Sequence, residues 1–124
     1  TARANKAEPI LFMSWAYKDK PEMTAQLAEQ YTLAGNANNA LVIPAGLAFA
    51  RSIAKKPDLE LYQPDKRHPS VAGSYLAVAT SFAAFTRKTP VGNPYTMGLD
   101  AATVAHLQET AWETVKDYYG DLGS

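Results

Sequence analysis

Asp65 and His68 are the residues of this chain whose types and spacing could perform acid–base chemistry. They stand three positions apart in "LYQPDKRHPSVAGSYL", residues 61–76, a stretch typical of a loop that leads into a helix. A carboxylate bonded to one imidazole nitrogen fixes the tautomer of the ring and leaves the other nitrogen free as a general base. Pro69 suits the first helical position, which would put His68 at or near the N-cap. The spacing therefore indicates an Asp–His dyad at a loop–helix junction.

The same spacing also has a purely structural explanation. Asp65 could cap the loop or the helix with its carboxylate, and His68 could then be an incidental residue of a solvated loop. Spacing alone does not separate a catalytic dyad from a capped loop, so both interpretations stay open at this point.

Two serines stand at positions that could matter for a site. Ser70 follows His68 by two residues at a helix start, where its hydroxyl would serve the first helical turn rather than act as a nucleophile. Ser14 and Trp15 lie at the end of a predicted strand, and α/β proteins tend to place site residues at strand ends. Trp15 could line a pocket or pack in the core.

The other histidine, His106, lies among polar neighbours of a predicted helix, so we expect it at the surface. Asp65, His68 and His106 lack the spacing of a metal site, and we expect neither a metal nor an organic cofactor. Core and rim packing explains the C-terminal aromatic set better than stacking on nucleic acid does. This set comprises Trp112, Tyr118 and Tyr119.

Charge and composition exclude several classes of partner. Twelve basic and twelve acidic residues cancel, and the longest basic cluster is only residues 66–68, so we expect no nucleic-acid partner. No apolar run approaches the roughly twenty residues of a membrane span. The chain has no cysteine, which removes disulfides and thiolate nucleophiles and leaves the cellular compartment open.

Hydrophobic periodicity predicts strands that alternate with helices. Two short apolar runs, residues 10–17 and 40–44, are typical of strands buried on both faces. The start, "TARANKAEP", resembles the frayed end of a helix that Pro9 stops. Further helices are predicted over residues 19–36, 45–57, 69–85 and 100–120.

Local signals refine these helices. Pro21 suits the first helical position of the first long helix, and Gly35 with Asn36 would stop it. Asp100 is the predicted cap of the last helix, which would end at Gly120. The predicted inward face of the helix at 69–85 comprises Val71, Tyr75, Val78, Phe82 and Phe85, widened by Ala72, Leu76, Ala79 and Ala83. That of the last helix comprises Val104, Leu107, Ala111, Val115 and Tyr118.

The predicted order indicates an α/β fold with parallel strands. Two parallel strands do not form a stable sheet, because both faces and both edges need cover. We therefore expect residues 1–124 to be the C-terminal portion of one doubly wound domain. Such a chain would pair with an N-terminal segment of the same protein or self-associate.

The stretch "LELYQPDKRHPSVAGSYLAVATSFAAF" resembles the closing block of SGNH (GDSL-type) hydrolases. In that family an Asp-x-x-His loop precedes the last long helix and often continues as His-Pro-Ser-x-x-Gly-x-Tyr-Leu. The matching positions are Asp65, His68, Pro69, Ser70, Gly73, Tyr75 and Leu76. The upstream stretches "VIPAGLAFARS" and "PILFMSWAY" are similar to elements of one bacterial branch, so the resemblance runs from about residue 9 to residue 90. Lys66 departs from the family, because many members have glycine there.

The resemblance implies the C-terminal half of a flavodoxin-like three-layer α/β/α domain with a parallel sheet. It also implies ester hydrolysis through an acyl-serine intermediate, with a small-molecule or carbohydrate ester as substrate. His68 would be the base, and Asp65 would orient it. The Gly-Asp-Ser nucleophile motif of the family does not occur in these 124 residues, and "GNANN" at 35–39 is better explained as a helix stop than as the family's asparagine motif. We therefore expect this chain alone to be inactive.

A second interpretation belongs to a different functional class. The chain could be a non-catalytic α/β binding or assembly module that keeps the hydrolase scaffold without its nucleophile. A Gly-Asp-Ser motif encoded upstream of Thr1 would favour the hydrolase, and a native start at Thr1 would favour the module.

Overall fold

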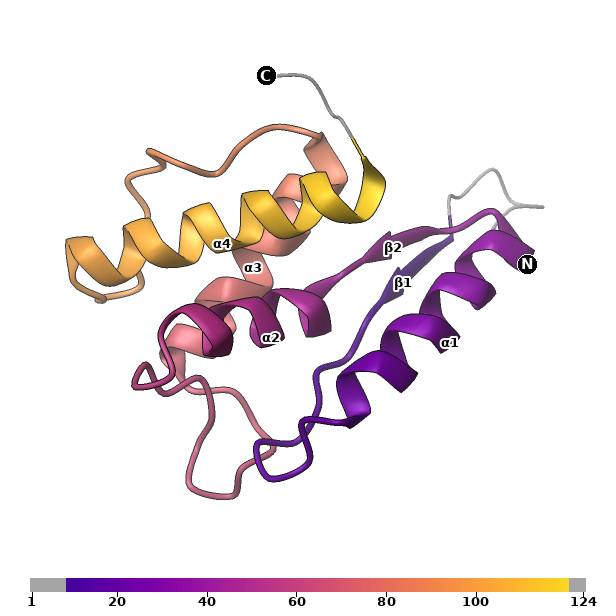
Figure 1. Cartoon of the computed structure of the whole chain (residues 1–124). Coiled ribbons are helices and arrows are strands. Elements are labelled where there is room, and N and C mark those ends of the chain that lie inside the picture. The colour runs from indigo at the N-terminus through magenta and orange to yellow at the C-terminus, as the bar shows by residue number, and fades with distance from the viewer. Residues whose placement is uncertain (1–8, 121–124) are drawn as a thin grey trace.

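The computed structural model describes residues 9–120, and the helix expected at the start of the chain lies outside them. The elements alternate as predicted for an α/β fold (Figure 1). They are β1 (Ile10–Phe12), α1 (Met23–Asn38), β2 (Leu41–Ile43), α2 (Ala45–Lys55), α3 (Val71–Thr86) and α4 (Ala101–Tyr119).

The two strands form a small parallel sheet, with residues 10–12 of β1 opposite residues 41–43 of β2. Each strand has three residues, fewer than the predicted apolar runs. The chain turns soon after Phe12: the Met13 amide still donates to the Ile43 carbonyl at 2.9 Å, but the Met13 carbonyl accepts from the Gly46 amide at 3.2 Å. The start of α2 therefore takes the place where the ladder would continue.

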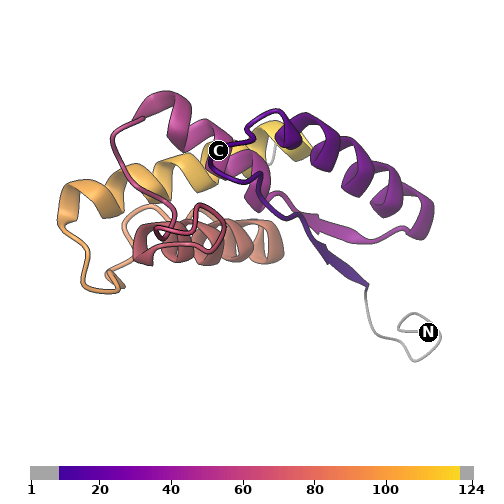
Figure 2. The same ribbon diagram turned by 90° about the horizontal axis from the view of Figure 1, so that it is seen from below.

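Helices cover both faces of β2. Successive strand side chains point to opposite faces, and Val42 faces α1, since a Cβ atom placed on Gly35 would lie 2.6 Å from Val42 Cγ2. Ile43 packs on the other face in a cluster with Ala83 and Ala84 of α3. The strands thus lie between α1 and α3, as the view from below shows (Figure 2). The described residues thus form an α/β fold of four helices and a small two-stranded parallel sheet.

Gly35 does not stop α1, contrary to the prediction. The helix starts at Met23, two residues after Pro21, and continues to Asn38, where Asn39 ends it in the left-handed conformation with φ of 50° and ψ of 45°. Gly35 is instead a packing residue, because any side chain there would collide with Val42 of the sheet. The stretch "GNANN" does contain a helix stop, four residues later than expected.

The start of α3 also differs from the prediction. Ser70 is the N-cap, and its hydroxyl oxygen accepts a hydrogen bond from the Gly73 amide at 3.2 Å. Pro69 lies before the helix, because it pairs with Tyr62 in an isolated antiparallel bridge. His68 therefore stands two residues before the N-cap and belongs to the loop.

The predicted inward face of α3 is wrong in four of its five main positions. Tyr75 is buried, but Val71, Val78, Phe82 and Phe85 are exposed, Val78 by 53% and Phe85 by 65%. The buried side is the one formed by the small residues that were expected only to widen the face. Periodicity fails here because α3 has no charged residue to mark its solvent-facing side. The strand residues Ile10 and Phe12, expected to be buried, are each 42% exposed.

The remaining core agrees with the sequence. Asp100 caps α4 by accepting from the Thr103 amide at 3.2 Å, and Gly120 follows the helix end. Four of the five inward residues predicted for α4 are buried, and Tyr118 is partly buried. The main core cluster joins α2, α3 and α4 around Phe49, Leu76 and Leu107. Among the residues from 9 to 120, no helix is both long and apolar enough to cross a membrane.

Gly73 allows α3 to lie against the segment that leads into the Asp65–His68 loop. A Cβ atom at this position would lie 2.2 Å from the Leu61 carbonyl oxygen. Helix propensity alone would make Gly73→Ala stabilising by about 1 kcal/mol. We expect the opposite, a loss of about 1–3 kcal/mol in the free energy of unfolding, because a backbone carbonyl must move. Urea unfolding measures this, with Ser74→Ala in the same turn as the control; a more stable Gly73→Ala variant would contradict the packing.

Candidate functional site

Asp65 and His68 lie in a closed turn, residues 62–69, which we call the dyad loop. The Gln63 amide donates to the His68 carbonyl at 2.8 Å, and the Lys66 amide donates to the Gln63 carbonyl at 2.9 Å. Outside these bonds Tyr62 and Pro69 form the antiparallel bridge already described. The loop is thus a short, internally bonded hairpin that projects from the start of α3.

The structure brings the two predicted site residues together. Asp65 Oδ1 accepts from the amides of Arg67 and His68, each at 3.0 Å. Asp65 Oδ2 is hydrogen-bonded to His68 Nδ1. One carboxylate therefore shapes the turn with one oxygen and holds the imidazole with the other; a catalytic role for the pair stays a prediction.

The far side of the imidazole faces open space. Within residues 9–120, His68 Nε2 has no hydrogen-bond partner, and the His68 side chain is 73% exposed. With Nδ1 bonded to a carboxylate, Nε2 is the nitrogen that can take a proton from an incoming group. This geometry would allow His68 to act as a general base toward a group placed next to Nε2.

The pKa of Asp65 is lowered from its ordinary value of 3.8 to about 2. The bond from the His68 ring is the largest cause, followed by the bonds from the Arg67 and His68 amides. All three bonds favour the ionised carboxylate. Asp65 therefore stays charged through the pH range in which a histidine titrates, and can stabilise an imidazolium.

Lys66 is the residue where the sequence departs from the glycine of many SGNH hydrolases. Its φ of 64° lies in the left-handed region, which glycine adopts freely. A side chain there costs roughly 1–2 kcal/mol. The turn accepts this cost because the Lys66 amide and carbonyl are both hydrogen-bonded, to Gln63 and Lys18. The departure leaves the Asp65–His68 bond in place.

The segment that follows β1 forms hydrogen bonds that fix the position of the dyad loop. Trp15 Nε1 donates to the Arg67 carbonyl at 2.9 Å, and the Lys18 amide donates to the Lys66 carbonyl at 2.9 Å. The Arg67 guanidinium lies over the Tyr17 ring, 4.6 Å from its centroid. These contacts join the two loops that lie side by side in Figure 1. Lys18 and Tyr17 carried no recognisable signal in the sequence.

Of the two roles considered for Trp15, core packing is the one that the structure shows. Its ring is partly buried and stacks on Phe49 of the core, with ring centroids 4.5 Å apart. Its indole nitrogen is the anchor for the dyad loop. Ser14 is exposed and its hydroxyl makes only a long contact of 3.5 Å with the Trp15 carbonyl, so it contributes nothing to the site.

Ser70 has the structural role predicted for it. Its hydroxyl donates to the Glu60 carbonyl at 2.8 Å and accepts from the Gly73 amide at 3.2 Å. Both bonds tie the start of α3 to the preceding segment, and they occupy the oxygen that a nucleophile would need free.

His106 is not at the surface, contrary to the prediction. It is partly buried, and its Nε2 is hydrogen-bonded to Ser52 Oγ at 2.9 Å. Burial lowers its pKa from the ordinary value of 6.5, and the charges of Lys56 and Lys55 add to this. Periodicity missed the contact because it depends on how α2 packs against α4. This serine–histidine pair cannot meet a substrate, since Ser52 is fully buried.

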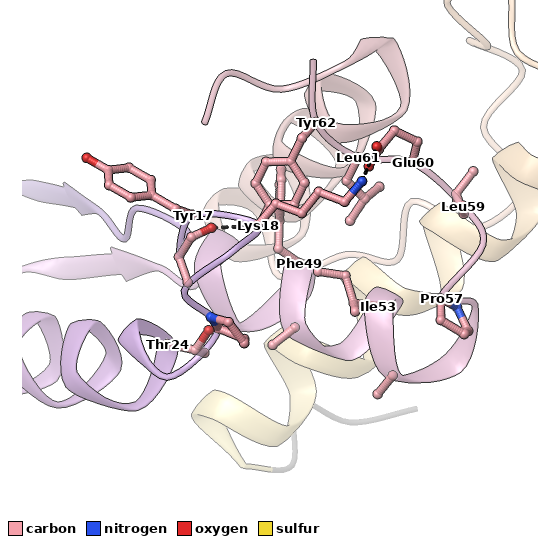
Figure 3. Close-up of a pocket in the computed structure, with 14 residues that line it drawn as sticks. Tyr17, Lys18, Thr24, Phe49, Ile53, Pro57, Leu59, Glu60, Leu61 and Tyr62 are labelled. Atoms are coloured by element: carbon pink, nitrogen blue, oxygen red, sulfur yellow. Dashed lines mark hydrogen bonds and ion pairs between the residues drawn. The ribbon is translucent and has the colours of Figure 1, made fainter. Parts of the chain in front are cut away.

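A cavity of about 400 Å³ lies beside the dyad loop, between the segment that follows β1, α2 and the segment that follows α2 (Figure 3). Most of its lining is apolar and includes Phe49, Ile53 and Leu59. At its edge Lys18 forms an ion pair with Glu60, and this bond lowers the pKa of Glu60.

Tyr62 connects this cavity to the dyad loop, because it lines the cavity and also pairs with Pro69. Its hydroxyl donates to the Ala16 carbonyl at 2.6 Å. Burial, followed by the nearby charge of Glu60, raises the pKa of Tyr62 to about 12. Tyr62 therefore stays neutral and acts as a wall. No group of three histidine or acidic side chains that could hold a metal occurs in the described part of the chain.

One solved structure resembles this chain over almost its whole length. A DUF4886 family protein from Bacteroides uniformis superposes with a TM-score of 0.78 and 22% sequence identity. The match covers 94% of this chain and 50% of that protein, so the chain spans half the length of the structure it resembles. At this identity the likeness establishes the fold. No protein-family model and no curated protein matches the chain in sequence.

The Asp65–His68 bond can be measured directly by titration. We expect the Asp65 carboxyl carbon to titrate near pH 2 in a carbon-13 NMR experiment. In His68→Ala the pKa should rise toward 3.8 without reaching it, because the two amide bonds remain. Since folding lowers this pKa, the stabilising contribution of the bond is present above about pH 3.8 and is lost as the pH falls through 2. An Asp65 pKa equal in both proteins would show that the ring does not bind the carboxylate.

Proposed function

We propose that this chain is the Asp–His portion of an SGNH-type ester hydrolase. The observation that supports this proposal best is the dyad loop, where Asp65 holds the His68 ring by Nδ1 and leaves Nε2 exposed and without a partner in the described chain. The resemblance of residues 59–85 to the closing block of that family agrees with this geometry. The match to half of a larger α/β protein agrees with a chain that holds only part of a site.

In the proposed reaction His68 Nε2 takes the proton of a serine hydroxyl while the serine oxygen forms a bond to the ester carbonyl carbon. Collapse of the tetrahedral intermediate breaks the bond between that carbon and the alcohol oxygen, and the imidazolium returns the proton to the leaving alcohol. Water then attacks the acyl-serine with His68 again as base, which releases the acid. Asp65 stabilises the imidazolium in both steps. No metal or organic cofactor takes part.

The serine and the oxyanion-hole donors would come from a segment of the same protein outside these residues. Within residues 9–120 no serine is hydrogen-bonded to His68, and the Gly-Asp-Ser motif is absent from all 124 residues. The substrate would be a small-molecule or carbohydrate ester, the class that the family resemblance implies.

Paired substitutions in the full gene product test the roles of the dyad. We expect His68→Ala to lower kcat for a p-nitrophenyl ester by up to about a million-fold, as in other triads. Asp65→Asn should lower kcat on the order of ten thousand-fold, because the imidazole would be held in the wrong tautomer. The matched controls are His106→Gln and Asp117→Asn, which change the same residue types away from the dyad loop and should leave turnover near normal. Normal turnover in both dyad variants would refute the hydrolase.

Thermal midpoints of the same variants separate chemistry from folding. The dyad residues are exposed, so their removal should shift the midpoint by little. A lowered midpoint with normal turnover would mean that Asp65 and His68 serve only to shape the turn.

A second candidate function, a non-catalytic binding module, is favoured by one observation, the apolar cavity beside the dyad loop. If this cavity is a ligand site, naphthalene should bind there and shift the NMR signals of Phe49, Ile53 and Leu59. Ile53→Trp should fill the space and abolish those shifts. Binding together with no detectable ester turnover by the full gene product would favour the module; shifts that survive Ile53→Trp would place the ligand elsewhere.

A further inference from the structure

The outer edge of β2 is closed by one hydroxyl group. The Leu41 amide donates to the Pro9 carbonyl, and the Ile43 carbonyl accepts from the Met13 amide, so these groups face β1. The amide and carbonyl of Val42 point the other way. Tyr119 Oη accepts from the Val42 amide at 2.9 Å and donates to the Val42 carbonyl. A further strand therefore cannot pair with β2 at its centre.

The outer edge of β1 is open. In a parallel ladder the amides and carbonyls of Ile10 and Phe12 face away from β2, and within residues 9–120 they have no hydrogen-bond partner. Unpaired strand edges of this kind are sites where another strand can add. The sheet can therefore grow past β1 and not past β2.

The side chains next to this edge are apolar and uncovered. Phe12 stands opposite Ile43 in the register, so Ile10 and Phe12 point to the face of the sheet that α3 covers. Ile10 and Phe85 line one hollow on the surface, which makes the strand and the helix stripe continuous. We call this surface the apolar flank; it comprises Ile10, Phe12, Val71, Val78, Phe82 and Phe85.

The size of the apolar flank suits packing against further strands of the sheet. From Val71 to Phe85 the stripe is about 21 Å long at about 1.5 Å per residue. A helix about 10 Å wide covers about two strands spaced about 4.8 Å apart. α3 packs on the sheet at Ile43 of β2, which leaves its apolar stripe exposed, and its first residue follows the dyad loop by two positions.

We infer that the apolar flank docks an α/β segment outside this chain, which adds strands to the open edge of β1 and packs its apolar face beneath α3. The solved structure that this chain resembles is one polypeptide of which the match covers 50%, and this extra length in the same polypeptide is the reason to choose this occupant over a second copy of the chain. The inference rests on the proposed function in one respect: it takes the docked segment to be the one that would bring the serine toward His68.

Amide hydrogen exchange compares the 124-residue chain with the longer product of its gene, which includes whatever is encoded before Thr1. In the longer protein the Ile10 and Phe12 amides should exchange at least about a hundredfold more slowly than in the short chain. The internal control is the Val42 amide, whose Tyr119 partner is present in both proteins and whose rate should not change. Equal rates at Ile10 and Phe12, or a gene with no segment before Thr1, would overturn the inference. Protection in the short chain that disappears on dilution would assign the flank to a second copy and overturn it as well.

Substitutions in the longer protein alone give an independent test, which holds even where the short chain does not fold. Val78→Asp and Phe85→Asp should lower the melting temperature by roughly 5–10 °C, because the charge would be buried in the interface. The matched control is Leu33→Asp, on α1, where the side chain is 61% exposed and lies outside the flank. Equal, small shifts in all three variants would show that the flank stays exposed.

Neither test measures turnover, so the docking inference and the hydrolase proposal can fail separately. If the segment docks but the dyad variants keep normal turnover, the docking inference stands and the hydrolase proposal fails. If turnover depends on the dyad but the flank stays exposed, the hydrolase proposal stands and the docking inference fails.

Discussion

The position of the dyad depends on the hydrogen bonds between the dyad loop and the chain that leaves β1. Tyr62 at the base of the loop belongs to the core cluster, but residues 63–68 are exposed, so their place relative to the sheet is fixed by the bonds from Trp15 and Lys18 to the carbonyls of Arg67 and Lys66. Trp15 is itself stacked on Phe49 in the core. The sheet, the core and the candidate base are thereby joined through one side chain.

The Asp65–His68 pair is held in a fixed orientation but is open to solvent. Asp65 is held by three hydrogen bonds and His68 is oriented by one of them, so the ring geometry is set before any substrate arrives. Both side chains nevertheless remain largely in water, where electrostatic effects are weak. The larger contribution to such catalysis comes from donors in a site that excludes water. A segment docked on the apolar flank would both cover the dyad and supply these donors, which ties the energetics of folding to those of the proposed chemistry.

Much of the local structure followed from the sequence. Strand runs, the cap at Asp100 and the face of α4 were predictable because each depends on residues close in the chain. The Asp65–His68 contact was predictable for the same reason. The buried face of α3 was not, since an uncharged helix has no polar side to mark its orientation. His106 and Gly35 were misjudged because their partners, Ser52 and Val42, lie on other elements. The anchors at Lys18 and Tyr17 act mainly through backbone or through stacking, which leave no pattern in the sequence.

The Tyr119 hydroxyl lies 77 positions after the strand residue whose amide and carbonyl it binds. During synthesis β2 is therefore complete long before its edge can be closed. At about 5–20 residues per second, the ribosome needs roughly 4–15 seconds to reach Tyr119. Throughout that interval the Val42 amide and carbonyl lack the hydroxyl that closes this edge, and strand segments with open edges can pair wrongly with chains on neighbouring ribosomes. Tyr119, the last residue of α4, therefore closes the β2 edge only after all the other helices and strands have been made.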